Sequence, residues 1–382
     1  QIYNGSYATF LMAMAGARIV KIEPKEGEHL RRRASVGGAA LPFAMLNSNK
    51  QSVTLNLKSP RGLALLFEMV KRADVLLENF APGTTERLGF GWERVHEVNP
   101  RIVYASGSGY GLSGPYRDYP AMDLTVQAMA GVMSVTGFPD RPPVKAGPAI
   151  CDFFGGVHLY GAVMTALYER ETTGVGRLVE VSMQEAVYPS LSSNLGLYYG
   201  SDGQVSIRTG NRHGGLAESP YNVYPTSDGY IAIICVGETH WKSLVKAMER
   251  SDLEGDPRFA SLGRRVANMD LVDDIVSSFT RRYDKQSLFE LLRKHRVPCA
   301  PVRDLDEVVN DPHMHARGAL AWINHPDLGR IPVPRSPLRY HGSEPPPLVP
   351  SRRLGEDNRT VYAEWLGLSG AEIDGLEREG VI

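Results

Sequence analysis

The chain has 382 residues, with 42 Lys or Arg against 43 Asp or Glu, and its formal net charge is -1. This balance gives no case for a nucleic acid or an anionic membrane as partner, so any phosphate-bearing ligand must meet a local cluster of cations. Cys151, Cys235 and Cys299 lack zinc-ligand spacing and suit a reducing compartment. No apolar run approaches the length of a membrane span and no signal peptide is visible. We expect a cytoplasmic protein without a metal site.

The first half of the chain alternates helix and strand patterns. Residues 1–16 look like a strand-to-helix loop and a helix without the preceding strand, so we expect that a leading segment is missing. Strand patterns then occur at residues 18–23, 52–57, 74–78, 101–105 and 177–182. Helix patterns occur at residues 59–70, 92–98, 123–137 and 183–199. This alternation predicts right-handed crossovers and a parallel sheet, so the fold class is α/β, with a doubly wound, Rossmann-like large domain.

The pattern changes after residue 200. Residues 201–215 are rich in glycine and polar residues, and two strand patterns around the turn at 225–229 are typical of a hairpin. Helix patterns follow at residues 239–249, 268–281 and 285–295. We divide the chain into a large domain at 1–200, a linker with a glycine loop at 201–220, a small α+β domain at 221–312, and a return to the large domain with a C-terminal helix at 313–382.

Asp152 is the candidate around which the chemistry is organised. It lies between a loop with Gly and Pro and a run whose apolar residues recur at helical spacing, which places it at or next to a helix N-terminus. There a carboxylate should remain ionised at neutral pH and can serve as a simple N-cap. The alternative is a nucleophile that attacks an activated acyl group and holds it covalently. Gly147, Gly155 and Gly156 favour this alternative, because they let another backbone or a ligand come close.

Two other patterns are weaker. Cys151 could be a thiol nucleophile, but no paired base is close in sequence, and we interpret it as a small buried residue. Gly109–Gly114 fits the G-x-G-x-x-G pattern of a dinucleotide site after a strand. Residues 115–120 contain two prolines and postpone the next helix to Asp123, whereas the dinucleotide site needs a helix inside the glycines.

Several motifs occur together and in order along nearly the whole chain. They are Glu23-Pro24, Leu46–Lys50, Glu78–Gly83, Tyr104–Gly111, Met133–Gly137, Asp152 before its helix, Thr173–Arg177, Tyr224–Gly229 and Val297–Val302. This set resembles the class III coenzyme A transferases, the family of formyl-CoA transferase and carnitine CoA-transferase. The resemblance implies a large domain built from both chain ends, an inserted small domain, and an interlocked homodimer. It also implies acyl-CoA and a small carboxylic acid as substrates, with no permanently bound cofactor.

The resemblance assigns roles to individual residues. Asp152 aligns with the aspartate that forms a mixed anhydride with the donor acyl group and then an aspartyl-CoA thioester. Asp123 is expected near the substrate. His213, Gly214 and Gly215 stand near a glycine-rich flap, although a plain turn explains them equally well. The implied CoA contacts are Gln1, Ile2, Tyr3, Leu55, Lys58, Asn79, Phe80 and Arg87.

Three departures from the family pattern bear on the substrates. Tyr3 stands where oxalate-using members have a glutamine, which argues against formyl-CoA and oxalate. Pro24 stands where some members have an arginine that contacts CoA, so Lys25 or the run Arg31–Arg33 is expected to replace that contact. The sequence His213–Gly215 is shorter than the usual glycine run.

Two other classes of protein compete with the transferase interpretation. The α-methylacyl-CoA racemases of the same family need two bases on opposite faces of the substrate carbon. They carry a histidine directly before the residue that matches Asp123, where this chain has Met122, and His158 is the only histidine near Asp152 in sequence. A CoA-binding protein without turnover would leave Asp152 unexplained. We therefore prefer the transferase.

Overall fold

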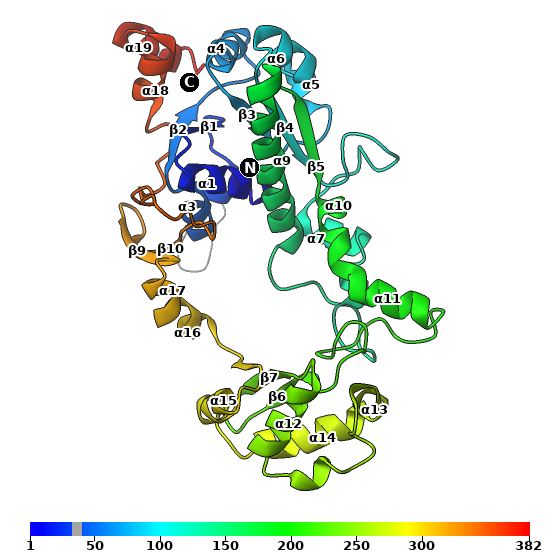
Figure 1. The fold of residues 1–382 in the computed structure, drawn as a ribbon. Helices are drawn as coiled ribbons and strands as arrows, with labels where there is room; N and C mark the ends of the chain where they lie inside the picture. The colour runs from blue at the N-terminus through cyan, green and yellow to red at the C-terminus, as the bar shows by residue number, and fades with distance from the viewer. Residues whose placement is uncertain (33–39) are drawn as a thin grey trace. The chain divides into compact units, whose positions relative to one another are not determined.

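The computed structural model describes residues 1–32 and 40–382 (Figure 1). Arg33, the last residue of the basic run, lies outside this part. The chain divides into two compact units. Unit 1 comprises Gln1–Val126, Pro148–Val187 and Val309–Ile382, and unit 2 comprises Gln127–Gly147 and Tyr188–Val308. Unit 1 thus contains residues from both ends of the chain. Unit 2 contains residues 127–147 and 188–220 together with 221–308, whereas residues 309–312, expected in the small domain, belong to unit 1.

Unit 1 contains the parallel strands. They are β1 (Ile19–Glu23), β2 (Lys50–Thr54), β3 (Val75–Glu78), β4 (Val103–Ser108) and β5 (Leu178–Ser182). β1 pairs in parallel with β2, and β3, β4 and β5 form a second parallel sheet in that order. The predicted α/β class with parallel strands is confirmed. Among the described residues these strands form two parallel sheets, because β1 and β3 do not pair with each other.

Helices surround these strands, and a hairpin follows near the carboxyl end. The helices are α1 (Asn4–Met14), α2 (His29–Arg32), α3 (Leu41–Asn47), α4 (Pro60–Val70), α5 (Thr84–Leu88), α6 (Trp92–Val98), α9 (Ile150–Thr173), α10 (Met183–Val187), α17 (Pro312–Ala316), α18 (Asn358–Leu366) and α19 (Gly370–Arg378). α7 (Asp123–Met129) and α16 (Leu305–Val309) run from one unit into the other. The antiparallel hairpin of β9 (Leu320–His325) and β10 (Gly329–Pro334), like α19, was missed by the sequence analysis.

Local signals explain where several helices begin and break. α4 begins where predicted, because the Ser59 side chain accepts a hydrogen bond from the Gly62 N–H and Pro60 occupies the first turn. The helix predicted over 183–199 is instead α10, a 3-10 turn at Tyr188–Leu191, and α11 (Ser192–Gly200). Pro189 lies at this break and has no N–H to continue the helix. The segment 123–137 breaks at Gly131, whose φ is 86°.

Helix α9 packs against β4, β5, α1 and α10 (Figure 1). By length and composition alone it could cross a membrane, so the expectation that no apolar run approaches that length is wrong. Leu159 and Val163 of α9 are fully buried in one cluster with Val103 and Ala105 of β4. Packing on the sheet of unit 1 therefore accounts for the apolar residues on one side of this helix, whereas Phe154, Val157 and Tyr168 are exposed.

Unit 2 contains the predicted hairpin, formed by β6 (Tyr221–Pro225) and β7 (Tyr230–Ile234), and β8 (Cys299–Pro301) pairs with β7. Its helices are α8 (Val132–Val135), α11, α12 (Glu238–Ala247), α13 (Leu262–Ala267), α14 (Met269–Thr280) and α15 (Lys285–Lys294), with a 3-10 turn at Ser251–Leu253. Trp241, Phe259 and Phe279 are buried in its core. This unit is α+β, as the change of pattern after residue 200 predicts.

The close approach of α1 to α9 depends on glycines. A Cβ added at Gly155 would lie 2.3 Å from Asn4 Nδ2, and one at Gly156 would lie 2.7 Å from the Asn4 carbonyl oxygen. On β4, a Cβ at Gly107 would lie 2.6 Å from Asn4 Oδ1. These glycines therefore let the backbone and the Asn4 side chain of α1 come close. For Gly155 and Gly156 the sequence analysis expected close approach of either another backbone or a ligand, and here it is another helix.

We predict that Gly155→Ala destabilises the fold by about 1–3 kcal/mol, because the new methyl group overpacks the Asn4 side chain. In an Asn4→Ala background the cost should be smaller, which urea unfolding midpoints of the four proteins would measure. Gly161→Ala on the same helix is the matched control, since its Cβ meets nothing within 4 Å. It should stabilise by about 0.5–1 kcal/mol through helix propensity. Equal effects at the two glycines would contradict this packing account.

Candidate active site

Asp152 is the third residue of α9 and only 9% exposed. The predicted position at a helix N-terminus is therefore confirmed. The N-cap residue is Ala149, which offers no side-chain cap, so Asp152 is not the N-cap of this helix. Its carboxylate lies in the first turn, near the positive end of the helix dipole.

A second carboxylate caps α9. Asp123 Oδ1 accepts hydrogen bonds from the backbone N–H groups of Cys151 at 2.9 Å and Asp152 at 3.2 Å. Asp123 begins α7, 29 residues earlier in the chain. It therefore performs the capping that the simpler interpretation gave to Asp152, and it places one carboxylate beside another.

This environment changes the protonation of Asp152. Burial, and then the nearby carboxylate of Asp123, raise the pKa of Asp152 from 3.8 to about 7. The expectation that this group is fully ionised at neutral pH is therefore wrong, because proximity to the helix N-terminus does not offset burial and a like charge. A carboxylate with such a pKa is ionised at slightly alkaline pH and is more basic than an ordinary aspartate.

The first residues of the chain lie beside Asp152. The Tyr3 ring stacks on Phe153 with a centroid distance of 5.8 Å, and the Tyr7 ring meets Phe153 edge-on at 4.9 Å. The Gln1 amine donates to Asn79 Oδ1, and Asn79 Nδ2 donates back to the Gln1 carbonyl at 2.9 Å. The structure thus joins the Gln1–Tyr3 loop both to the start of α9 and to the carboxyl end of β3.

Other predicted CoA contacts follow the carboxyl ends of β2 and β3. The Phe80 N–H donates to Glu78 Oε2 at 2.8 Å, and Lys58 is exposed beyond β2. Leu55 is 1% exposed in the apolar core, so its side chain offers no surface to a ligand. Arg87 lies on α5, exposed, with one guanidinium N–H donated to Thr84 Oγ1.

Arg117 was missed by the sequence analysis. A Cβ added at Gly83 would lie 3.2 Å from Arg87 Nη1 and 3.8 Å from Arg117 Nη2, so both guanidinium groups flank the same point of the loop after β3. Among the described residues 1–32 and 40–382, neither guanidinium group forms an ion pair with a carboxylate. The signal that could have found Arg117 is its position in the loop after β4, where parallel sheets bind ligands.

The cations expected to replace the contact at Pro24 have different surroundings. Arg31 pairs with Glu23 at 2.8 Å, donates to the Arg352 carbonyl, and stacks over Phe43. These contacts use the Arg31 guanidinium to fix α2 against its neighbours, so it is not available to a phosphate. Lys25 and Arg32 are exposed.

His213, Gly214 and Gly215 belong to unit 2, whereas Asp152 and Asp123 belong to unit 1. His213 Nδ1 accepts backbone N–H groups from Gly215 at 3.2 Å and from Ala217 at 3.3 Å. These bonds make the segment a turn closed on its own histidine. Its role as a flap stays a prediction.

The residues that a racemase would use as a second base, or a thiol enzyme as a nucleophile, are poorly suited to those roles. Met122, in the position of the racemase histidine, is 57% exposed. The His158 ring bonds through Nδ1 to the Phe154 carbonyl oxygen of its own helix at 2.8 Å. Burial raises the pKa of the Cys151 thiol to about 12, and its side chain is fully buried, as expected for a packed residue.

Across the described residues, no group of three potential ligands among His, Cys, Asp and Glu gathers to hold a metal ion.

The chain matches known proteins over nearly all of its length. The family model described as CoA-transferase family III matches residues 1–358. The chain belongs to CoA-transferase family III. A formyl-CoA:oxalate CoA-transferase of Streptomyces avermitilis is 36% identical over all of this chain and 96% of its own length. A succinyl-CoA–D-citramalate CoA-transferase of Chloroflexus aurantiacus is 33% identical over 99% of this chain and 94% of its own.

Solved structures give the same result. The crystal structure of a CaiB/BaiF family protein from Brucella suis superposes with a TM-score of 0.83 at 30% identity, covering 96% of each chain. The chain is thus an enzyme of the CoA-transferase type, which confirms the resemblance, and these relatives do not favour the racemase alternative.

We predict that Asp123→Asn shifts the acid limb of the pH–rate profile to lower pH. Asparagine keeps an oxygen that can accept the two N–H groups of α9, but it removes the charge that helps to raise the pKa of Asp152. Rates with a fixed acyl-CoA between pH 5 and 9 would measure the shift. Asp118→Asn, an exposed neighbour in the same loop region, is the control and should leave the profile unchanged. An unshifted limb in Asp123→Asn would show that this charge does not tune Asp152.

Proposed function

We propose that the enzyme moves CoA from an acyl-CoA donor to a free carboxylic acid, with the Asp152 carboxylate as nucleophile. The observation that carries the proposal is a largely buried carboxylate in the first turn of α9 whose pKa lies near 7. Its basicity makes it a better nucleophile than an exposed aspartate, and its burial limits the access of water to an activated intermediate.

The proposed reaction balances in four steps without an external energy source. Asp152 attacks the thioester carbonyl, the C–S bond breaks, and a mixed anhydride and CoA thiolate form. The thiolate attacks the aspartyl carbonyl of the anhydride and releases the donor acid, which leaves an aspartyl-CoA thioester. The acceptor carboxylate attacks this thioester to form a new anhydride and thiolate. The thiolate then takes the acceptor acyl group and restores Asp152.

CoA is placed at the carboxyl ends of the parallel strands, where doubly wound sheets bind ligands. Gln1, Ile2, Asn79 and Phe80 supply polar backbone and side-chain groups close together at this edge. Arg87 and Arg117 add two guanidinium groups without carboxylate partners in the described ion pairs, and such groups suit phosphate. We therefore assign Arg117 to the phosphate contact that Pro24 does not make.

The substrate acid is proposed to be small. Relatives are named for oxalate, D-citramalate and glutarate as acceptors or donors. Tyr3, stacked on Phe153, fills space next to Asp152 where oxalate-using members have a glutamine, so we propose an acid other than oxalate. The interlocked homodimer, the cytoplasmic location and the flap role of His213–Gly215 belong to the same proposal.

Asp152→Asn should abolish CoA exchange between an acyl-CoA and free acids, because the amide cannot form the anhydride. The measurement is exchange of isotope-labelled acids into acyl-CoA, over a panel that includes oxalate, D-citramalate and glutarate. Asp140→Asn, at an exposed carboxylate, is the control and should keep full exchange. Exchange that survives in Asp152→Asn at more than about one hundredth of the wild-type rate would remove Asp152 from the nucleophile's role.

Arg117→Gln should raise KM for acyl-CoA about tenfold with little change in kcat, since a charge-assisted contact to phosphate contributes roughly 1.4 kcal/mol. Dephospho-CoA thioesters decide which phosphate is bound. If the 3′-phosphate is the partner, the mutation should have no further effect on the dephospho substrate, whereas a diphosphate contact would keep the full effect. Arg293→Gln, at an exposed arginine of unit 2, is the control. A wild-type KM in Arg117→Gln would contradict the assignment.

A further inference from the structure

The Gln1–Tyr3 loop contains a strained residue. Ile2 has a φ of 56°, in the left-handed region. Among the described residues, six non-glycine residues have a positive φ, and Ile2 is the only one of them with a β-branched side chain. A β-branched side chain crowds its own backbone in this region, so contacts from the surroundings must hold the conformation. Strained residues of this kind gather at ligand-binding and catalytic sites.

A buried carboxylate holds Ile2 in this conformation. Glu28 is 5% exposed, and its Oε2 accepts the Ile2 N–H at 2.9 Å. Asn79 Nδ2 donates to the Gln1 carbonyl oxygen at 2.9 Å. This carbonyl and the Ile2 N–H belong to the same peptide group, which is therefore bound at both of its polar atoms. The peptide group cannot turn to relieve the strain at Ile2 unless both hydrogen bonds break.

A tight turn after β1 brings Glu28 to this place. The Gly27 N–H donates to the Pro24 carbonyl at 2.8 Å, and Gly27 has a φ of 72°, which glycine adopts without steric cost. The Glu28 N–H then donates to Glu23 Oε2 at 3.2 Å. Glu23 itself pairs with Arg31 at 2.8 Å. Of these two buried carboxylates, Glu28 is thus the one that reaches the Gln1–Tyr3 loop.

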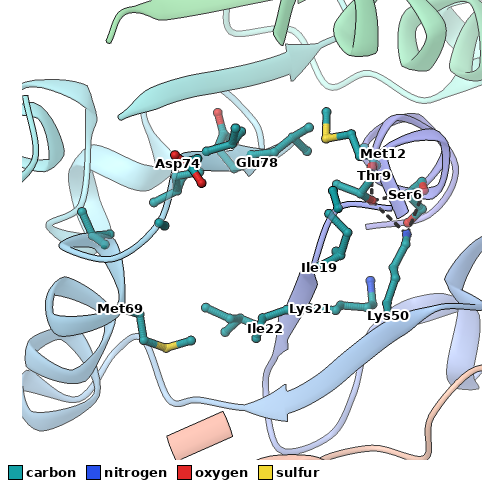
Figure 2. A pocket seen from close by; sticks show the side chains of 18 of the residues that line it. Ser6, Thr9, Met12, Ile19, Lys21, Ile22, Lys50, Met69, Asp74 and Glu78 are labelled. Carbon is teal, nitrogen blue, oxygen red and sulfur yellow. Dashed lines mark hydrogen bonds between the residues drawn. The ribbon is translucent and has the colours of Figure 1, made fainter. Parts of the chain in front are cut away.

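Two lysines on neighbouring strands divide the work of holding this region. Figure 2 shows Lys50 of β2 bonded to Ser6 and Thr9 of α1, with distances of 2.8 Å from Nζ to the Ser6 carbonyl oxygen and to Thr9 Oγ1. Lys21 of β1 instead lies with its Nζ 3.2 Å from Glu28 Oε1. Lys50 therefore fixes the helix, whereas Lys21 balances the buried charge of Glu28.

We propose that Glu28 is a positioning residue for the Gln1–Tyr3 loop: its carboxylate holds the strained Ile2 peptide group and thereby presents the loop to CoA. The inference rests on the proposed placement of CoA at the carboxyl ends of the strands. It goes beyond that placement because Glu28 acts through Ile2 and not on the substrate. Its carboxylate is buried, and its two oxygens face Ile2 and Lys21.

The same hold reaches the neighbourhood of Asp152. Tyr3 follows Ile2, and its carbonyl oxygen accepts the Tyr7 N–H at 2.7 Å in the first turn of α1. Its ring stacks on Phe153, the residue after Asp152. A change in the backbone direction at Ile2 therefore moves a loop that is attached at one end to Asn79 and at the other to α1 and α9.

The test compares two double variants that differ only in the acceptor for the Ile2 N–H. Lys21→Met with Glu28→Leu replaces the ion pair with apolar side chains and so leaves no unpaired buried charge. Lys21→Met with Glu28→Gln keeps an amide oxygen that can accept the N–H. The Leu variant should raise KM for acyl-CoA about tenfold, whereas the Gln variant should stay within about twofold of wild type. Glu26→Gln, at an exposed carboxylate two residues earlier, is the surface control and should leave KM unchanged.

A merely structural role would give a different result. Loss of folded enzyme lowers kcat and leaves KM unchanged, so a rise in KM is the signature of a misplaced loop. The strain supplies a second readout, because glycine adopts a positive φ without steric cost. In an Ile2→Gly background, the KM ratio between the Leu and Gln variants should therefore shrink. Equal ratios in the two backgrounds, or a wild-type KM in the Leu variant, would overturn the proposal.

Exchange of the Ile2 amide proton tests the hold without any substrate. With ¹⁵N-labelled isoleucine, NMR should show exchange at least about tenfold faster in the Leu variant than in the Gln variant. Equal exchange rates would overturn the proposal. Failure of the proposed CoA placement looks different, since the amide would still exchange faster while Arg117→Gln also kept a wild-type KM. If the Leu variant does not fold, Ile2→Pro replaces it: proline has no N–H and fixes φ near −65°, so KM should rise well above that of Ile2→Gly. Equal KM values in these two variants would contradict the proposal.

Discussion

Two hydrogen bonds from the start of α9 to Asp123 are the constraint on which the site depends. They satisfy two backbone N–H groups at the amino-terminal end of α9 without using Asp152 as a cap. The Asp152 side chain is therefore left for other contacts. They also hold a negative charge next to Asp152, which adds to burial in raising its pKa to about 7. A capping arrangement that satisfies backbone groups thereby sets the protonation of the carboxylate that we propose as nucleophile.

The rest of unit 1 keeps this arrangement in place. Gly155 and Gly156 let α1 approach α9 closely, and this approach brings Tyr3 and Tyr7 onto Phe153. The Gln1–Tyr3 loop then connects the first turn of α9 with the carboxyl end of β3. Through Ile2 the same loop is also hydrogen-bonded to Glu28, whose N–H donates to Glu23 at the end of β1.

Local patterns in the sequence predicted most elements and the position of Asp152. α6 has the predicted bounds, α4 begins within one residue of its predicted start, and the β6–β7 hairpin lies around the predicted turn. The predictions that failed concern the surroundings of Asp152 and the position of Arg117, which depend on contacts between residues distant in sequence. The bond from Asp123 spans 29 residues, and α1, at the start of the chain, packs against α9. Arg117 could not be linked to Arg87 by spacing, because the loops after β3 and β4 bring them together.

The most direct test of the central claim is chemical trapping of the activated Asp152 carboxyl group. The enzyme is mixed with a panel of acyl-CoAs at pH 8, quenched with hydroxylamine or borohydride, and mapped by peptide mass spectrometry. The account predicts that one acyl-CoA leaves a hydroxamate or a reduced side chain at Asp152 and at no other carboxylate. An unmodified Asp152 in an enzyme that is turning over the same acyl-CoA would contradict it.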